Sequence, residues 1–289
     1  MKALHEQGDF PIPVIVHIAQ PYWYGEGGDM SPDEFGVWAA EQLEKKILEV
    51  GEENVAAFIA EPIQGAGGVI VPPAGYHRRM WDLCQRYDVL YISDEVVTSF
   101  GRLGHFFASQ AVFGVQPDII LTAKGLTSGY IPMGGVVVRD EIVEVLNQGG
   151  EFYHGFTYSG HPVAAAVALE NIRILREEKI IEKVKAETAP YLQKRWQELA
   201  DHPLVGEARG VGMVAALELV KNKKTRERFT DKGVGMLCRE HCFRNGLIMR
   251  AVGDTMIISP PLVIDPSQID ELITLARKCL DQTAAAVLA

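Results

Sequence analysis

Two charged residues stand in this sequence where their side chains can do chemistry. Asp94 and Lys124 each follow an apolar run typical of a buried strand, Val89–Ile92 and Ile119–Thr122. Ligands of open α/β sheets bind outside the carboxyl ends of the strands, so we expect both side chains to converge on one pocket. A lysine that follows an apolar strand and precedes Gly125 can be desolvated, which makes its amine nucleophilic.

The pair has a specific chemical meaning. A lysine that forms a Schiff base and an aspartate that faces a pyridinium nitrogen are the pattern of a pyridoxal phosphate enzyme. The spacing alone leaves a second interpretation open, in which both residues are solvated charges in surface loops.

The elements that must position these residues alternate through the first half of the chain. Ser31 followed by Pro32 and Glu34 predicts a helix start with a capping box. A second helix is predicted over residues 76–87. Continuously apolar strands, as expected for a parallel sheet with helices on both faces, are predicted over residues 55–60, 89–92, 119–122 and 136–138.

The pattern changes after His161 and Pro162. A long helical stretch, residues 163–200, is expected to break near Pro190, and strands are predicted over 211–220, 247–250 and 256–259. Helices are predicted near 234–244 and 269–280. We therefore expect two domains, a large one over residues 1–165 and a smaller α+β domain over residues 166–289.

Composition narrows the class of protein. The 289 residues carry 28 Lys and Arg against 38 Asp and Glu, a net charge of −10, which argues against nucleic-acid binding. The four cysteines are too scattered for a disulfide framework and favour a reducing compartment. No apolar run reaches the roughly 18 residues of a membrane span. These features predict a cytoplasmic protein without a membrane partner.

Longer stretches resemble one family. Residues 93–102 (SDEVVTSFGR), 117–126 (PDIILTAKGL) with 131–135 (IPMGG), 154–162 (HGFTYSGHP) and 60–65 (AEPIQG) resemble motifs of the class III aminotransferases. The resemblance spans essentially the whole chain. It implies the α/β fold of type I pyridoxal-phosphate-dependent transferases, with part of a large, mainly parallel-sheet domain and a C-terminal α+β domain.

The resemblance also implies roles. Lys124 resembles the lysine that forms the Schiff base with pyridoxal 5'-phosphate and moves the substrate proton, and Asp94 resembles the partner of the ring nitrogen. Val96 resembles the aliphatic residue on one ring face, and Glu61 is expected to shape the cofactor pocket or to be purely structural. Thr157 resembles a phosphate-binding hydroxyl that reaches across a dimer, which implies a homodimer with shared active sites.

Substrate recognition follows from the same resemblance. Arg250 resembles the arginine that binds a substrate carboxylate, although it is also explained as a surface arginine after a strand. Trp23 most simply serves packing but is also a candidate to approach the substrate. Ala66 and Val97 stand where relatives acting on ornithine or 4-aminobutyrate usually carry Glu and Gln. The sequence thus favours the ω-amine:pyruvate group, with an ω-amine, polyamine or ω-amino acid as donor and a 2-oxo acid such as pyruvate as acceptor.

The start of the chain resembles an interior stretch of longer relatives. The Gly-Ser turn that would bind the cofactor phosphate and the aromatic residue that would stack on the ring are expected upstream. The chain is therefore expected to be the C-terminal part of an aminotransferase. The alternative is a catalytically inactive remnant with a structural or partner-binding role, and an aminomutase or decarboxylase is the near variant.

One group of cysteine and histidine residues has ligand types suited to a metal but lacks a complete ligand set. Cys238, His241 and Cys242 would lie on one helix, but no second ligand pair has suitable spacing, so we expect buried cysteines and no metal.

Overall fold

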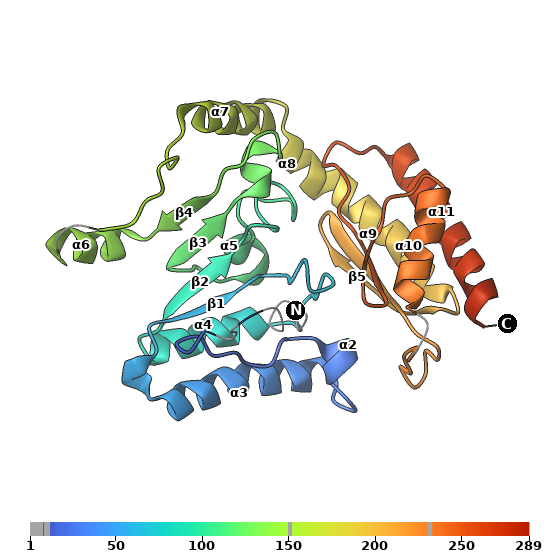
Figure 1. The fold of residues 1–289 in the computed structure, drawn as a ribbon, viewed down its shortest axis with the longest axis horizontal. Helices are drawn as coiled ribbons and strands as arrows, with labels where there is room; N and C mark the ends of the chain where they lie inside the picture. Colours follow the sequence, from blue (N-terminus) through green and yellow to red (C-terminus); the bar gives the residue numbers. More distant parts are fainter. Residues whose placement is uncertain (1–7, 9–11, 150–151, 231–232, 289) are drawn as a thin grey trace.

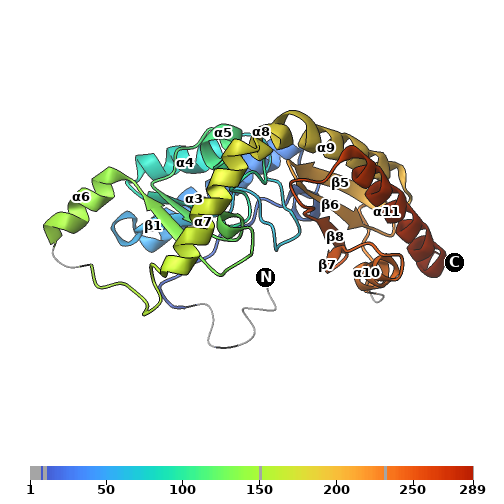
Figure 2. The same ribbon diagram turned by 90° about the horizontal axis from the view of Figure 1, so that it is seen from above.

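A computed structural model describes residue 8 and residues 12–149, 152–230 and 233–288 of the chain. Two sheets lie side by side, each with its own helices, and the C-terminus lies at the far end of the second unit (Figure 1). Viewed from above, the molecule is elongated, with α6 at one end and α11 at the other (Figure 2). The helical elements are α2 (Trp23–Glu26), α3 (Pro32–Val50), η1 (Glu52–Asn54), α4 (Tyr76–Arg86), α5 (Ala108–Phe113), η2 (Lys124–Thr127), α6 (Asp140–Gly149), α7 (Pro162–Glu177), α8 (Ile180–Lys183), η3 (Val184–Thr188), α9 (Ala189–Gln197), η4 (Glu198–Asp201), α10 (Val234–Arg244) and α11 (Pro266–Val287).

The first sheet has the order β1-β2-β3-β4, formed by β1 (Ala57–Ala60), β2 (Leu90–Asp94), β3 (Ile119–Thr122) and β4 (Gly135–Val138). The pairs β1–β2 and β2–β3 are parallel, as predicted. β4 is antiparallel to β3, because the connection between them holds only the short η2 turn and no crossover helix. The sheet is therefore mixed: β1, β2 and β3 are parallel, and β4 is an antiparallel strand at one edge.

Helices α3 and α4 cover one face of this sheet. The predicted capping box is confirmed: Ser31 Oγ accepts the amide of Glu34, and the Glu34 carboxylate accepts the amide of Ser31. Phe35 and Met80 from the two helices are fully buried in a common apolar core. The amphipathic pattern of α3 thus docks it against α4 under the strands.

The second sheet has the antiparallel order β5-β6-β8-β7, formed by β5 (Val205–Val211), β6 (Val214–Leu219), β7 (Arg250–Val252) and β8 (Thr255–Ile258). The apolar pattern did not predict β5, since this edge strand includes Glu207 and Arg209 among its residues. The core of the second unit lies between this sheet and helices α9, α10 and α11, around the fully buried Trp196.

The helical stretch predicted over residues 163–200 has a break that the sequence did not indicate. The break is at Lys179, which has a left-handed backbone (φ 51°) between α7 and α8. Near Pro190, where the interruption was expected, the α-helix gives way to the π-helical turn η3, and α9 begins at Ala189.

The border between the two units stays a prediction, and packing describes it in more detail. α7 begins at Pro162 and packs on η2 of the first unit through Ala168 and Leu175. The buried cluster of the second unit begins at Val184. The predicted border after residue 165 thus falls within α7, whose buried face belongs to the first unit.

No helix among the described residues is long and apolar enough to cross a membrane. The four cysteines are all buried free thiols.

A buried histidine fixes the end of β1 to α4. The imidazole of His77 lies between Pro62 O (2.8 Å from Nε2) and Tyr91 Oη (2.9 Å from Nδ1). A carbonyl can only accept, so Nε2 carries the proton and Nδ1 accepts from the tyrosine. Burial lowers the pKa of His77 to about 4, only partly offset by the bond to Pro62.

This geometry predicts an acid-dependent loss of stability. The pKa of His77 is lower in the folded chain than the ordinary 6.5, so the unfolded chain takes up the proton first as the pH falls from 6.5 towards 4. Between pH 7 and pH 5 this residue should remove about 2 kcal/mol from the free energy of unfolding. Urea titrations of the chain and of His77→Gln at both pH values measure the difference, which the variant should lack. His154→Gln, at an exposed histidine, is the control, and an equal pH dependence in all three proteins would contradict the prediction.

Candidate active site

Three charged residues lie where β1, β2 and β3 end, a place we call the carboxyl edge. Asp94 is the last residue of β2, Glu61 follows β1, and Lys124 follows β3 as the first residue of η2. Because β2 and β3 are parallel and pair Asp94 with Leu121, the ends carrying Asp94 and Lys124 lie at the same edge. The sequence prediction that these two residues converge is therefore supported by the strand register.

Electrostatics links the third residue to the pair. Burial raises the pKa of Glu61, the amide of Gly65 (3.0 Å from Oε2) lowers it, the negative charge of Asp94 raises it, and the positive charge of Lys124 lowers it. Glu61 therefore lies within the electrostatic reach of both other groups. The carboxyl edge combines one amine and two carboxylates.

The backbone at Lys124 is held in an unusual conformation. Lys124 has a positive φ of 38°, which is rare for a residue other than glycine. Asn171 of α7 donates to the carbonyls of Gly125 (2.8 Å) and Leu126 (3.0 Å), so the helix fixes the turn that begins at the lysine. Gly125 is also required there, since a β-carbon at this position would lie 2.9 Å from Phe100 Cβ.

One expectation about Lys124 is wrong. Its side chain is exposed in this chain, so the desolvation expected from the preceding apolar strand is not observed among the described residues. β3 ends just before this point, as predicted, but the described residues do not bury the lysine.

Val96 and Asp94 are joined locally. The amide of Val96 donates to Asp94 Oδ1 (3.1 Å), and both side chains are half-buried. This bond fixes the carboxylate of Asp94 relative to the segment that follows β2. Val96 thus lies beside the aspartate, and its role next to a ring stays a prediction.

The remaining predicted residues lie elsewhere. Thr157 is exposed in residues 152–161, the segment that leads into α7 and extends away from the first sheet (Figure 1). Arg250 is the exposed first residue of edge strand β7 in the second sheet. Trp23 donates from Nε1 to Met30 O (2.7 Å), carries the guanidinium of Arg226 4.3 Å from its ring centre, and lines a separate cavity. The roles given to these three residues stay predictions.

A buried glutamate next to the site was not recognised from the sequence. Glu95 is fully buried, and its carboxylate accepts the amides of Ala108 (2.6 Å) and Ser109 (2.9 Å) and the Ser109 hydroxyl (2.6 Å). It therefore caps the N-terminus of α5, whose own N-cap residue, Phe107, provides no side-chain bond. No local pattern could reveal a cap supplied from 13 residues away.

This cap yields a stability prediction. Glu95→Gln replaces one acceptor oxygen by an amide donor that faces backbone donors, so it should lower the free energy of unfolding by about 2–4 kcal/mol. Glu144→Gln, on the exposed surface of α6, should change it by less than about 0.5 kcal/mol. Urea titrations followed by far-UV circular dichroism compare the two variants, and equal small effects would show that the Glu95 cap is dispensable.

Comparison with known proteins agrees with this geometry. The family model of aminotransferase class-III matches residues 10–280. The chain is 89% identical to a putrescine–pyruvate aminotransferase of Pseudomonas aeruginosa, over its full length and 63% of that protein. It is 43% identical to gamma aminobutyrate transaminase 1 of Solanum lycopersicum, over 98% of the chain and 56% of that protein.

Solved structures give the same result. A structure described as a transaminase with L-ala superposes with a TM-score of 0.94 at 40% identity, covering 99% of this chain and 69% of that one. An omega transaminase mutant from Pseudomonas jessenii gives 0.92 at 39% identity, covering 98% of this chain and 64% of that one. The chain thus spans little more than half to about two thirds of the length of these relatives. On the family match and the arrangement of its carboxyl edge, the chain belongs to the class III aminotransferases.

Proposed function

We propose that this chain carries the catalytic lysine of an aminotransferase that moves an amino group from an ω-amine, a polyamine or an ω-amino acid to a 2-oxo acid such as pyruvate. The observation that carries the proposal is the meeting of Lys124 and Asp94 at the carboxyl edge, within electrostatic reach of Glu61. The identity of 89% to a putrescine–pyruvate aminotransferase favours putrescine as the donor and pyruvate as the acceptor.

The donor set at this edge fits pyridoxal phosphate, the cofactor of the family. Lys124 offers an exposed amine for the aldehyde carbon, and Asp94 offers a fixed carboxylate for the ring nitrogen. When bound, pyridoxal phosphate supplies the electron sink that lets a proton leave the carbon bearing the amine. The residues required on one side of the cofactor are therefore present in the described part of the chain.

Each residue has a distinct proposed task. The Lys124 amine holds the cofactor and then carries the proton to and from the substrate carbon. Asp94 keeps the ring nitrogen protonated, Val96 packs on the ring, and Glu61 closes the pocket beside the pair. These tasks need fixed backbones, and the bonds from Asn171 and to Glu95 provide them.

Substrate selection is assigned to residues outside the edge. Arg250 is proposed to bind the carboxylate of the 2-oxo acid, for which a planar guanidinium is suited. Trp23 keeps its proposed place near the substrate, although the bond to Met30 and the contact with Arg226 tie it to the junction of the two units.

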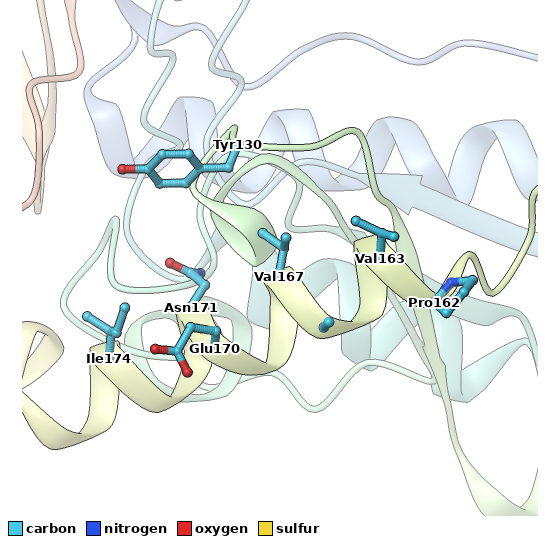
Figure 3. A pocket seen from close by; sticks show the side chains of 8 residues that line it. Tyr130, Pro162, Val163, Val167, Glu170, Asn171 and Ile174 are labelled. Atoms are coloured by element: carbon cyan, nitrogen blue, oxygen red, sulfur yellow. The ribbon is translucent and has the colours of Figure 1, made fainter.

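We also infer a homodimer with shared active sites. Phe152, Tyr153, Phe156 and Tyr158 are between 67% and 89% exposed in the segment that carries Thr157. Beside it, an apolar cavity of about 640 Å³ lies along α7, where Val163, Val167 and Ile174 line one side and Tyr130 lies across from them (Figure 3). Apolar surface of this extent usually marks an interface. A second copy would cover it and bring Thr157 to the partner's cofactor phosphate.

A reducing compartment, the cytoplasm, is the proposed location. All four cysteines are buried free thiols, which matches a protein that folds without disulfides.

The function is tested by trapping the cofactor on the chain. We expect purified chain mixed with pyridoxal phosphate and reduced with borohydride to carry the label on Lys124, because this lysine shares the carboxyl edge with Asp94 and its charge acts on Glu61. Putrescine added before reduction should lower the label, since it competes for the same aldehyde. Peptide mass spectrometry measures both effects.

A matched variant separates the site from surface chemistry. Lys124→Arg should abolish the label at this position, whereas Lys179→Arg, at another exposed lysine with positive φ (51°), should leave it unchanged. A label scattered over exposed lysines, with Lys124 labelled no more than the others, would refute the proposed function and favour the catalytically inactive alternative.

The dimer is tested on α7. Val163→Asp places a charge on the proposed interface but near the helix N-terminus, where a negative charge favours the helix. It should weaken dimerisation at least about tenfold in sedimentation velocity experiments. Met236→Asp, at a similarly exposed residue on α10, should leave the dimer unchanged. A monomeric unsubstituted chain at micromolar concentration, or equal behaviour of both variants, would overturn the assignment.

A further inference from the structure

Residues 61–70, between β1 and α4, form a compact turn beside the candidate site, which we call the 61–70 turn. The Glu61 carboxylate accepts the amide of Gly65, and the carbonyl of Gly65 accepts the amides of Gly68 (3.2 Å) and Val69 (3.1 Å). Gly65 lies against the segment after β2, since a β-carbon there would be 3.1 Å from Val97 Cγ2. The position of Glu61 is therefore coupled to the position of the whole turn.

An arginine of the second sheet holds the far end of this turn. Arg209 of β5 is only 8% exposed, and it donates from Nε to Val69 O (2.9 Å) and from Nη2 to Gly68 O (2.7 Å). Two parallel donors on one rigid plane fix both the distance and the orientation of the two carbonyls. The bond crosses from the second unit to the first and spans about 140 residues of sequence.

The guanidinium is itself held by buried carboxylates. Its Nη1 donates to Glu207 (2.6 Å) and to Glu218 (2.9 Å), and Glu218 is fully buried. Glu218 also accepts from Arg228 (2.8 Å) and from Thr255 (3.0 Å). We call Glu207, Arg209, Glu218 and Arg228 the ionic cluster. The two carboxylates and two guanidinium groups of the cluster balance in charge. The carboxylates hold Nη1 of Arg209, while its Nε and Nη2 donate to the turn.

We infer that Arg209 is a positioning residue of the proposed active site, which holds the 61–70 turn and through it Glu61 at the carboxyl edge beside Asp94 and Lys124. The inference rests on the proposed function. Buried ion pairs add little net stability compared with apolar residues of similar size, so stability alone is a weak reason for this cluster. The hydrogen bonds from Arg209 to the carbonyls of Gly68 and Val69 give the cluster a different role, which is to position the turn.

Arg228 provides the matched comparison. It bonds to the same Glu218 and donates to Tyr22 Oη (2.7 Å), but the structure gives it no bond to the 61–70 turn among the described residues. Arg209→Leu and Arg228→Leu both unbalance the ionic cluster, but only the first releases Gly68 and Val69.

The experiment measures hydrogen exchange of the amides of residues 64–70 in the purified chain by mass spectrometry. Arg209→Leu should accelerate this exchange about tenfold or more. Loss of the net stabilisation that one hydrogen bond provides already accounts for a change of roughly this size. Arg228→Leu should leave it within about twofold of the unsubstituted chain. Far-UV circular dichroism confirms folding, and if Arg209→Leu does not fold, Arg209→Lys, whose single ammonium cannot hold both carbonyls, takes its place.

A second readout reports on the site. At saturating pyridoxal phosphate, the visible circular dichroism of the bound cofactor should change in Arg209→Leu and remain unchanged in Arg228→Leu, because only the former moves Glu61. Equal changes in both variants, in exchange or in the spectrum, would reduce Arg209 to a purely structural residue and overturn the inference. If the unsubstituted chain shows no label on Lys124, the proposed function fails, while the exchange comparison still decides whether Arg209 holds the turn.

Discussion

The buried carboxylate of Glu95 holds together the elements on which the candidate site depends. The backbone amide of Glu95 donates to Leu121 O (2.9 Å) of β3, the carboxylate caps α5, and the backbone carbonyl accepts the hydroxyl of Ser99 (2.7 Å). The residue thus joins the neighbouring strand, a helix and the following turn at one point. Because Asp94 precedes it and Val96 follows it, the two neighbours have little freedom. A charge buried in this way persists only when donors surround it, and here they come from Ala108 and Ser109 at the start of α5.

The two units of the molecule are joined by both apolar and polar contacts. Ile63 and Val69 of the first unit pack with Val214 and Ala216 of the second. Arg102 reaches from the segment after β2 to the carbonyls of Met213 (3.2 Å) and Pro260 (2.6 Å). Apolar contacts hold the units together without specifying an angle, whereas hydrogen bonds to fixed carbonyls specify orientation. The proposed role of Arg250, which comes from the second unit, requires this orientation to be defined.

The site as proposed is distributed over surfaces that one copy of the chain does not bring together. Lys124, Asp94 and Glu61 share an edge, but Thr157 lies in an exposed aromatic segment and the cavity along α7 is open. This arrangement has a physical logic, because phosphate binding by a second copy would make cofactor binding dependent on assembly. Helix α7 contacts both the lysine turn and the proposed interface. Its Asn171 fixes the turn at Lys124, while Val163 and Val167 line the open cavity.

The sequence by itself determined the features that depend on near neighbours. The capping box at Ser31, the apolar strands and the placement of Asp94 and Lys124 at their carboxyl ends follow from local patterns, and the family followed from ordered motifs. Only the tertiary structure decided the direction of β4, the strand β5 with its polar residues, the break at Lys179 and the exposure of Lys124. It also revealed Glu95, His77 and Arg209, whose partners lie 13, 15 and about 140 residues away. A buried polar side chain is defined by the donors and acceptors that folding brings around it, and sequence patterns contain no record of such distant partners.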